Sequence, residues 1–349
     1  MVIKKKRNVV TLKDIAKEVG VDKSTVSRAL NSGTQDLLTP EVVAKIQDAA
    51  TRMGYRKNQL ARSLRTHRTM IVGIVLPDIT NTLFAPIVRG AESVLEPLGY
   101  TSMIVNTDDD SERRNYLIGV LLERGVDGII DAAPQISASP FKTIEEHGIP
   151  LVTAIRKTDH TSIPAVINDD EEGIRLLIQY LYARGHRKIA HIAGPLALST
   201  GNLRLNAFKH HMIHIGLDIP EKAIAYANRF DEDEGSRCAL DLLVSGLDCS
   251  AVICANDRLA LGAIKALHQS GVTCPEHISV TGFNDLPFLN LIPPGLTTIR
   301  IQQFDVGRLS AELLTRMMTT QDATIPRTSI LPVELVERGS VSKPWTNSF

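Results

Sequence analysis

From residue 70 onward the sequence alternates short apolar segments with longer amphipathic segments, and this alternation restricts the fold more than any other feature. The short segments have the length of buried strands, whereas the longer ones repeat apolar residues at helical spacing. Alternation of this kind predicts parallel sheets with helices on both faces. The expected strands lie at 71–76, 102–106, 128–131, 151–154, 165–168, 188–193, 250–255 and 278–283.

The expected helices between these strands lie at 85–98, 111–124, 171–184, 204–215, 233–243 and 257–269. So many strands exceed what one small open sheet holds. We therefore expect an α/β core of two doubly wound parallel-sheet subdomains with a cleft between them. A ligand is expected in that cleft, at the carboxyl ends of the strands.

The residues before this region predict a small all-α unit of three short helices. The helices are expected at 12–19, 23–30 and 41–53, and their N-caps at Thr11, Asp22 and Thr39. Gly20 ends the first helix, and Asp14 pairs with Thr11 in a variant of the capping box. The first helix, the tight turn and the second helix together have the form of a helix-turn-helix.

The second helix turns a polar face outward, as a recognition helix in the major groove of double-stranded DNA would require. Its candidates for reading bases are Lys23, Ser24 and Arg28. Phosphate contacts are expected from Thr11, Thr25, Ser27, Asn31 and Tyr55. The alternative is a plain amphipathic helix pair with a solvated face.

Charge is distributed unevenly along the chain. Residues 1–68 carry 15 Lys and Arg against 6 Asp and Glu, although the whole chain has 39 of each. A basic head on an acidic body is typical of a nucleic-acid-binding module joined to another function. A solvated basic tail would explain residues 4–7 alone, but the excess continues to Arg68.

Residues 57–68 have helical propensity but only a thin apolar stripe, formed by Leu60, Ala61 and Leu64. A helix this short is marginal by itself. We interpret the segment as a linker that folds only with a partner.

The chain resembles the Lac repressor and purine repressor (LacI-type) family of bacterial transcription regulators over nearly its whole length. The helix-turn-helix at 11–31 carries the resemblance first, and short motifs continue it in the same order. These motifs are Gly54-Tyr55, Asn58–Leu64, Arg124–Gly128, Arg184–Lys188, His191–Pro195, Ala255–Asp257, Ile278–Gly282, Leu296–Ile299 and Val336–Arg338.

The resemblance implies three domains. They are a DNA-binding domain over 1–56, a hinge over 57–68 and an effector-binding core over 69–349 that is similar to periplasmic binding proteins. Within the core, the N-subdomain is expected at about 69–167 and 302–331, and the C-subdomain at about 168–301 and 332–345.

The resemblance also implies roles for single residues of the helix-turn-helix and of the hinge. Lys23, Ser24 and Arg28 match the base-reading positions. The hinge positions that enter the minor groove match Asn58, Leu60, Ala61 and Leu64. Leu64 matches the apolar wedge between bases, its alternative being an ordinary core leucine. Lys57 stands where many members have proline.

Candidate effector-binding residues follow from the same matches. They are Asp78, Asn81, Phe84, Arg156, Arg204, Phe230, Asn256, Asp257 and Asn284. Aromatic rings with carboxylate and amide groups suit sugars. Asn284 stands where several relatives carry Asp. Asp257 alternatively caps the next helix.

Two of these candidates, Arg156 and Arg204, would make the cleft cationic, which favours a sugar acid or a sugar phosphate over a neutral sugar. Arg156 alternatively faces solvent.

Three histidines, at 210, 211 and 214, have a spacing that can ligate a metal. We expect no metal, because no Cys or carboxylate completes a set nearby, and we expect no cofactor. The four cysteines show no CxxC pair. We find no catalytic signature of the common enzyme classes, so an enzyme is the weaker alternative. A pure small-molecule binding module would leave the basic head unused.

The expected mechanism is that of a two-state regulator, and the resemblance to the family implies that it is a repressor. A homodimer is expected to bind a pseudo-palindromic operator, and a small-molecule effector shifts its DNA affinity. Members of the family that form tetramers carry leucine heptads at the C-terminus. This sequence shows none there, so we expect a dimer. The absence of a signal peptide and of an apolar run long enough to cross a membrane leads us to expect a cytoplasmic protein.

Overall fold

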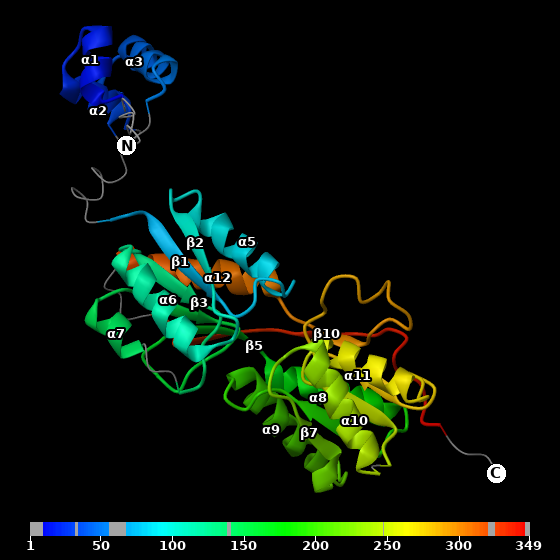
Figure 1. Cartoon of the computed structure of the whole chain (residues 1–349). Helices are drawn as coiled ribbons and strands as arrows, with labels where there is room; N and C mark the ends of the chain where they lie inside the picture. The colour runs from blue at the N-terminus through cyan, green and yellow to red at the C-terminus, as the bar shows by residue number, and fades with distance from the viewer. Residues whose placement is uncertain are drawn as a thin grey trace, which may run out of the picture. The chain divides into compact units, whose positions relative to one another are not determined.

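A computed structural model of the chain describes residues 10–31, 34–55, 68–137, 141–246, 248–319 and 325–345. It divides into two compact units. We call Met1–Thr69 the headpiece and Met70–Phe349 the core. Figure 1 shows the elements of both.

The headpiece packs three α-helices around a small apolar centre. They are α1 (Leu12–Val19), α2 (Lys23–Ala29) and α3 (Pro40–Arg52), with a 3-10 turn, η1 (Gln35–Leu37), before α3. Ile15, Val26 and Ile46 are fully buried, one from each helix. These contacts bring the apolar stripes of three marginal helices together, which is what stabilises them.

Local sequence sets the ends of α1. The Asp14 carboxylate accepts hydrogen bonds from the backbone N and the hydroxyl of Thr11, both at 2.8 Å. These bonds hold the pKa of Asp14 below its usual value. Gly20 ends the helix with a φ of 75°, a conformation that favours glycine.

The first half of the core is a six-stranded parallel sheet with the order β11-β5-β4-β3-β1-β2. Its strands are β1 (Ile71–Leu76), β2 (Thr101–Asn106), β3 (Gly128–Asp131), β4 (Leu151–Ala154), β5 (Ala165–Asn168) and β11 (Thr328–Leu331). Successive side chains of β1 point to opposite faces, so Ile74 and Val75 belong to different apolar clusters.

Helices cover both faces of this sheet (Figure 1). The Ile74 cluster includes residues of α5 (Phe84–Leu95) and α12 (Gln303–Thr319), and the Val75 cluster includes residues of α6 (Ser111–Glu123) and α7 (Phe141–Glu146). We call this sheet with its four helices the N-lobe.

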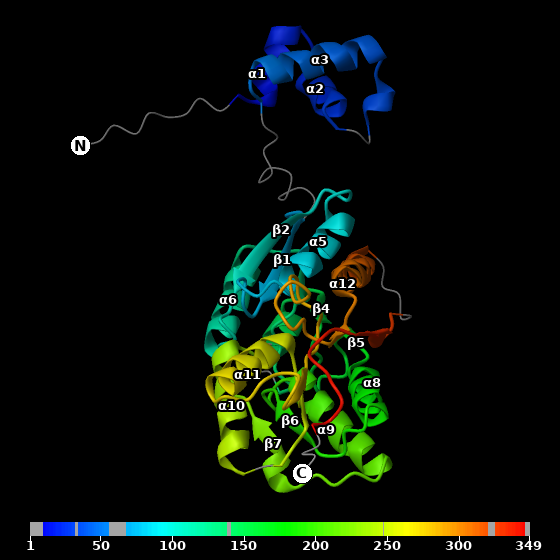
Figure 2. The ribbon, with the colours of Figure 1, turned by 90° about the vertical axis from the view of Figure 1, so that its right-hand side faces the viewer.

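The second half of the core, which we call the C-lobe, is a four-stranded parallel sheet with the order β7-β6-β8-β9. Its strands are β6 (Ile189–Ala193), β7 (Ile224–Tyr226), β8 (Ala251–Cys254) and β9 (Ser279–Thr281). Its helices are α8 (Asp170–Ala183), α9 (Ser199–His214), α10 (Glu232–Val244) and α11 (Asp257–Gln269), with a 3-10 turn, η2 (Glu221–Ala223). Figure 2 shows α10 and α11 on the side of this sheet opposite to α8.

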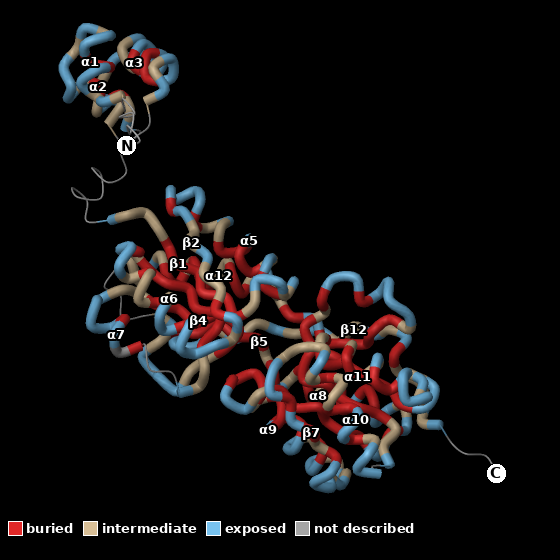
Figure 3. The backbone as a smooth tube through the Cα atoms, in the orientation of Figure 1, coloured by how far each residue is buried: buried red, intermediate tan, exposed pale blue. Residues whose placement is uncertain are grey.

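The chain returns to both lobes near its C-terminus. Strand β11 pairs with β5 in the N-lobe sheet, and β12 (Glu334–Val336) then forms a separate antiparallel ladder with β10 (Thr298–Arg300). Figure 3 shows that buried residues concentrate in the strands and on the inner sides of the helices of both lobes. Two doubly wound parallel sheets with an all-α headpiece confirm the expected fold class.

In the described part of the chain, no helix combines the length and the apolar character that a membrane span needs.

Candidate functional site

The outward face of α2 carries the three residues predicted to read bases. Lys23, Ser24 and Arg28 are exposed, whereas Val26 and Ala29 face the apolar centre of the headpiece. The carboxylate of Asp22 accepts a hydrogen bond from the backbone N of Ser24 at 2.7 Å and so caps the helix. The donors on this face are therefore presented by a fixed helix.

The predicted phosphate contacts surround this face unequally. Asn31 is exposed, whereas Thr25, Ser27 and Tyr55 are half-buried. Burial raises the pKa of the Tyr55 hydroxyl, so it remains a proton donor. Thr11 is exposed, but its hydroxyl already donates to Asp14. The anionic Asp14 beside it makes Thr11 the least suitable of the five for a phosphate.

The hinge residues Asn58, Leu60, Ala61 and Leu64 lie outside the described residues.

Four of the predicted effector residues meet at the carboxyl ends of β8 and β9. They are Arg204, Asn256, Asp257 and Asn284, all at most 4 % exposed. Arg204 Nη1 donates to the carbonyl of Ala255 at 2.6 Å, and its guanidinium lies over the Phe283 ring, 3.7 Å from the centroid. The alternation of strands and helices predicts a ligand at the carboxyl ends of the parallel strands, and the structure brings these four residues together at that edge.

The charge of Arg204 is balanced inside the protein. Its Nε donates to Asp170 Oδ1 at 2.7 Å, and the two side chains are 3 % and 4 % exposed. Burial raises the pKa of Asp170, and the guanidinium of Arg204 opposes that rise. Asp170 was not predicted as a site residue, although it begins α8 directly after a buried strand.

Asn256, and not Asp257, caps α11, because Asn256 Oδ1 accepts from the backbone N of Leu259 at 2.8 Å. The alternative role as a helix cap that we considered for Asp257 is therefore wrong. The Asp257 carboxylate instead accepts from the backbone N of Leu286 and from the Thr298 hydroxyl. Burial raises its pKa to about 6.

Asn284 has a φ of 124°, which is unusual for a residue other than glycine. Its backbone N donates to Ile299 at 2.8 Å, and its carbonyl accepts from Gln303 Nε2 at 3.0 Å. These two bonds hold a strained residue at the edge of the C-lobe sheet, as is common at ligand sites.

Phe230, from the same lobe, is half-buried and packs onto Gly194, where a Cβ would lie 2.3 Å from the ring.

Three of the predicted effector residues lie at the end of β1 and the start of α5. Asp78 accepts from the backbone N of Thr80 at 2.9 Å, and Asn81 Oδ1 accepts from the backbone N of Leu83 at 3.1 Å. Phe84 is 3 % exposed and packs in the apolar cluster of the core. Its ring is thus already covered by protein on most sides.

Arg156 is buried and does not face solvent, which corrects the alternative that we left open for it. Its Nη1 lies 2.8 Å from Asp109 Oδ1. Because Arg156 and Arg204 each have a carboxylate partner, the predicted excess of positive charge at these two residues is also wrong. The partners come from distant parts of the chain.

The sequence did not predict an ion pair that joins the two lobes. Arg258, on α11 of the C-lobe, donates from Nη1 to Asp78 of the N-lobe at 3.0 Å and from Nη2 to Glu232 at 2.7 Å. Asp78 therefore joins the two lobes as well as being a candidate ligand.

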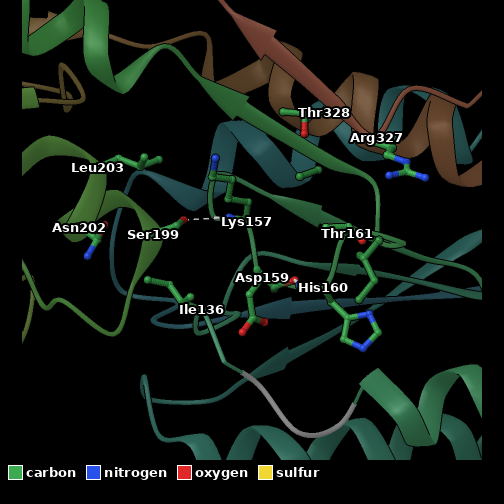
Figure 4. Close-up of a pocket in the computed structure, with 13 residues that line it drawn as sticks. Ile136, Lys157, Asp159, His160, Thr161, Ser199, Asn202, Leu203, Arg327 and Thr328 are labelled. Atoms are coloured by element: carbon green, nitrogen blue, oxygen red, sulfur yellow. Dashed lines mark hydrogen bonds between the residues drawn. The ribbon is translucent and has the colours of Figure 1, made fainter. Parts of the chain in front are cut away.

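A cavity of about 460 Å³ also lies between the lobes (Figure 4). Ser199, Asn202 and Leu203 of α9 line one side of it, and residues 157–161 and Arg327 line the other (Figure 4). Ser199 Oγ accepts from the backbone N of Lys157 at 2.9 Å. None of the nine predicted effector residues lines this cavity. The polar run that follows β4 was the available signal for it.

The histidines of α9 meet a carboxylate from α8. His210 Nδ1 lies 3.5 Å, and His211 Nε2 3.8 Å, from Glu171 Oε1. The premise that no carboxylate completes a set is therefore wrong, because α8 packs beside α9.

Comparisons with known proteins cover both units. The family described as "Bacterial regulatory proteins, lacI family" matches residues 11–58, and the "Periplasmic binding protein-like domain" matches residues 178–341. The chain is 30 % identical to a "Ribose operon repressor" of Halalkalibacterium halodurans, over 94 % of this chain and 96 % of that protein. It is 31 % identical to the "HTH-type transcriptional regulator RegA" of Clostridium saccharobutylicum, over 95 % and 98 %.

Solved structures agree with these matches. A Lac repressor dimer bound to operator and the anti-inducer ONPF superposes with a TM-score of 0.85 and 26 % identity, over 96 % of this chain and 100 % of that one. A LacI family transcriptional regulator of Enterococcus faecium with bound ribose superposes with a TM-score of 0.67 and 27 % identity, over 78 % and 99 %.

Proposed function

Since the chain belongs to the lacI family of bacterial regulatory proteins, which bind DNA and regulate transcription, we propose that it is a repressor whose operator affinity is switched by a sugar. The observation that carries the DNA-binding half is the face of α2. There Lys23, Ser24 and Arg28 are exposed on a capped helix whose other side is fully packed. Such a face fits the major groove, where ammonium, hydroxyl and guanidinium donors reach base edges.

The contacts to phosphates set the position of α2 on the DNA. We assign them to Thr25, Ser27, Asn31 and Tyr55, with Thr11 as the weakest contributor. A homodimer binds a pseudo-palindromic operator with two such headpieces. The hinge residues Asn58, Leu60, Ala61 and Leu64 remain predictions for the minor groove between them.

The effector half rests on the group at the ends of β8 and β9. Amide, carboxylate and guanidinium groups meet there and can bind the hydroxyls of a sugar. Because Arg156 and Arg204 are both ion-paired, an uncharged sugar suits this group better than a sugar acid or a sugar phosphate. The relatives named for ribose are consistent with that class.

The test of the DNA-binding half uses the full chain and a palindrome selected from random DNA. Fluorescence anisotropy between 50 and 200 mM salt should show a loss of affinity of about 10³-fold or more, as counterion release from several phosphates requires. Random DNA of the same length should bind more weakly at every salt concentration. Equal affinity for both DNAs would contradict the proposal.

A further inference from the structure

Among the described residues, one group of His and Glu side chains has the geometry of a metal site, and it lies on the outer side of the C-lobe. Glu171 stands on the first turn of α8, and His210 and His211 stand on α9. One nitrogen or oxygen atom of each residue lies within 4.8 Å of those of the other two. The group shares no residue with the lining of the cavity between the lobes.

The distances are close to those of a coordination sphere. Zn²⁺ binds imidazole nitrogen at about 2.0–2.1 Å and carboxylate oxygen at about 2.0–2.2 Å, so neighbouring ligand atoms of a tetrahedral site stand roughly 3.3 Å apart. Glu171 Oε1 already lies 3.5 Å from His210 Nδ1 and 3.8 Å from His211 Nε2. Glu171 and His210 are mostly exposed, so small side-chain movements can close the set.

The side chain of His211 is largely buried, whereas those of Glu171 and His210 are exposed. Its Nε2 is buried and has no hydrogen-bond partner. A buried polar atom without a partner costs free energy, and such an atom in a native structure calls for an explanation. A metal ion bound to this nitrogen would satisfy it.

The surroundings leave room for the ion. A cavity of about 180 Å³ adjoins the group and is lined by His210, His211 and His214 among others. Arg175 also lines it, but its guanidinium donates to Glu172 and to Gln179 Oε1, at 2.5 and 2.6 Å. Its charge is therefore largely balanced by Glu172.

We propose that Glu171, His210 and His211 bind a divalent transition-metal ion, with Zn²⁺ as the probe and water completing the coordination. A donor set of two imidazoles and one carboxylate favours Zn²⁺ and similar transition-metal ions over Mg²⁺ or Ca²⁺. The ion joins α8 to α9, the two helices that carry Asp170 and Arg204. Metal binding thus stabilises the part of the C-lobe beside the proposed effector site.

Calorimetry on the full chain, free of metal and of any histidine tag, tests the proposal with ZnCl₂ and without DNA or sugar. We expect one Zn²⁺ per chain. The variants Glu171→Gln, His210→Ala and His211→Gln should each weaken Zn²⁺ binding at least about tenfold. Substitution of residues that only support a metal's ligands already causes a loss of that size. His268→Ala, on exposed α11 surface, is the matched control and should bind as the original chain does.

Co²⁺ identifies the ligands independently. Binding at this site should give visible d–d absorption without the near-ultraviolet band of a cysteine thiolate. The proposal is overturned if the metal-free chain takes up no Zn²⁺, if the three variants bind like His268→Ala, or if Co²⁺ shows the thiolate band. If a variant at His211 unfolds, Glu171→Gln, at an exposed position, decides the outcome alone.

Discussion

The cationic residues predicted to bind ligands differ between the headpiece and the core in exposure and in ion pairing. In the headpiece, Lys23 and Arg28 stand exposed on α2. In the core, Arg156 and Arg204 are buried, and each has a carboxylate partner. A surface that meets a partner as large as DNA can leave its donors to water until the partner arrives. A site inside the protein must satisfy its groups beforehand, because unpaired buried charge is costly.

This difference has a consequence for the effector. A sugar that binds near Arg204 has to share or replace bonds that the protein already makes with Asp170 and with the Ala255 carbonyl. Any change in those bonds acts on α8, α9 and the end of β8 together. We therefore expect ligand binding and rearrangement to be linked in the core, whereas the donors on α2 of the headpiece are already exposed.

The largest expected effect comes from breaking the buried pair. Arg204→Ala leaves Asp170 buried without its partner, and we expect a loss of roughly 3–5 kcal/mol in the free energy of unfolding, measured with urea. The sugar response should be lost as well. The double variant Arg204→Met, Asp170→Leu should recover most of the stability.

Arg237→Ala is the control for this experiment. Arg237 makes helical ion pairs with Glu234 and Asp241 but is 42 % exposed, so its loss should cost less than about 1 kcal/mol. If both single variants lose the same free energy, the contrast between the paired interior and the solvated surface is wrong.

The second prediction concerns pH. Burial raises the pKa of Asp257 to about 6, and in the unfolded chain it is about 3.9. The folded state therefore holds this proton more tightly, so the contribution to stability is complete below about pH 4 and is lost as the pH rises through about 6. About two pKa units correspond to roughly 3 kcal/mol.

Comparison of the original chain with Asp257→Asn isolates this contribution. His191 has the opposite dependence, because burial lowers its pKa to about 4 and its contribution is lost as the pH falls through that value. His191 is present in both proteins, so it cancels. Urea unfolding from pH 4 to pH 7 should show the stability of the original chain falling relative to Asp257→Asn; parallel curves would remove Asp257 from the account.

The third prediction concerns the exposed face. Arg28→Ala should weaken binding to the selected palindrome by about 1–3 kcal/mol and reduce discrimination at one base pair. The free energy of unfolding should hardly change, because the side chain is exposed. Arg52→Ala on α3, an exposed arginine paired with Asp48, is the matched control and should retain discrimination.

The smallest expected effect is at the start of α2. Asp22→Ala removes the cap on the backbone N of Ser24 and should destabilise the headpiece by about 1 kcal/mol. Hydrogen exchange of the α2 amides measures the loss without interference from the core. Thr39→Ala is the control, since its side chain makes no cap bond at α3, and exchange as fast in this variant would contradict the role of Asp22.

The same contrast explains what the sequence could predict. The ends of α1 are set by Thr11, Asp14 and Gly20, which lie at or near those ends in the sequence. Such local patterns are enough to locate the helices of the headpiece. The buried strands of the core are equally visible as apolar runs. Strand β11 is not, because its side chains are partly exposed and its pairing with β5 joins residues far apart in the sequence.

Partners inside the site were out of reach for the same reason. Arg204 and Asp170 are 34 residues apart, Arg156 and Asp109 are 47 apart, and Arg258 and Asp78 are 180 apart. A pattern along the chain indicates that an arginine lies near a strand end. Which carboxylate it meets depends on how each lobe folds and, for Arg258 and Asp78, on how the two lobes meet, so the neutralised arginines and the bridge between the lobes appear only in the structure.

If the proposed function is right, a sugar bound to the core changes the DNA affinity of the headpiece. The direct measurement takes an uncharged sugar that raises the melting temperature of the chain and determines operator affinity by anisotropy, at one salt concentration, with and without a saturating amount of it. We expect the operator affinity to change by about fivefold or more, the usual size of coupling between two sites. An operator affinity that stays the same while the core is saturated would contradict it.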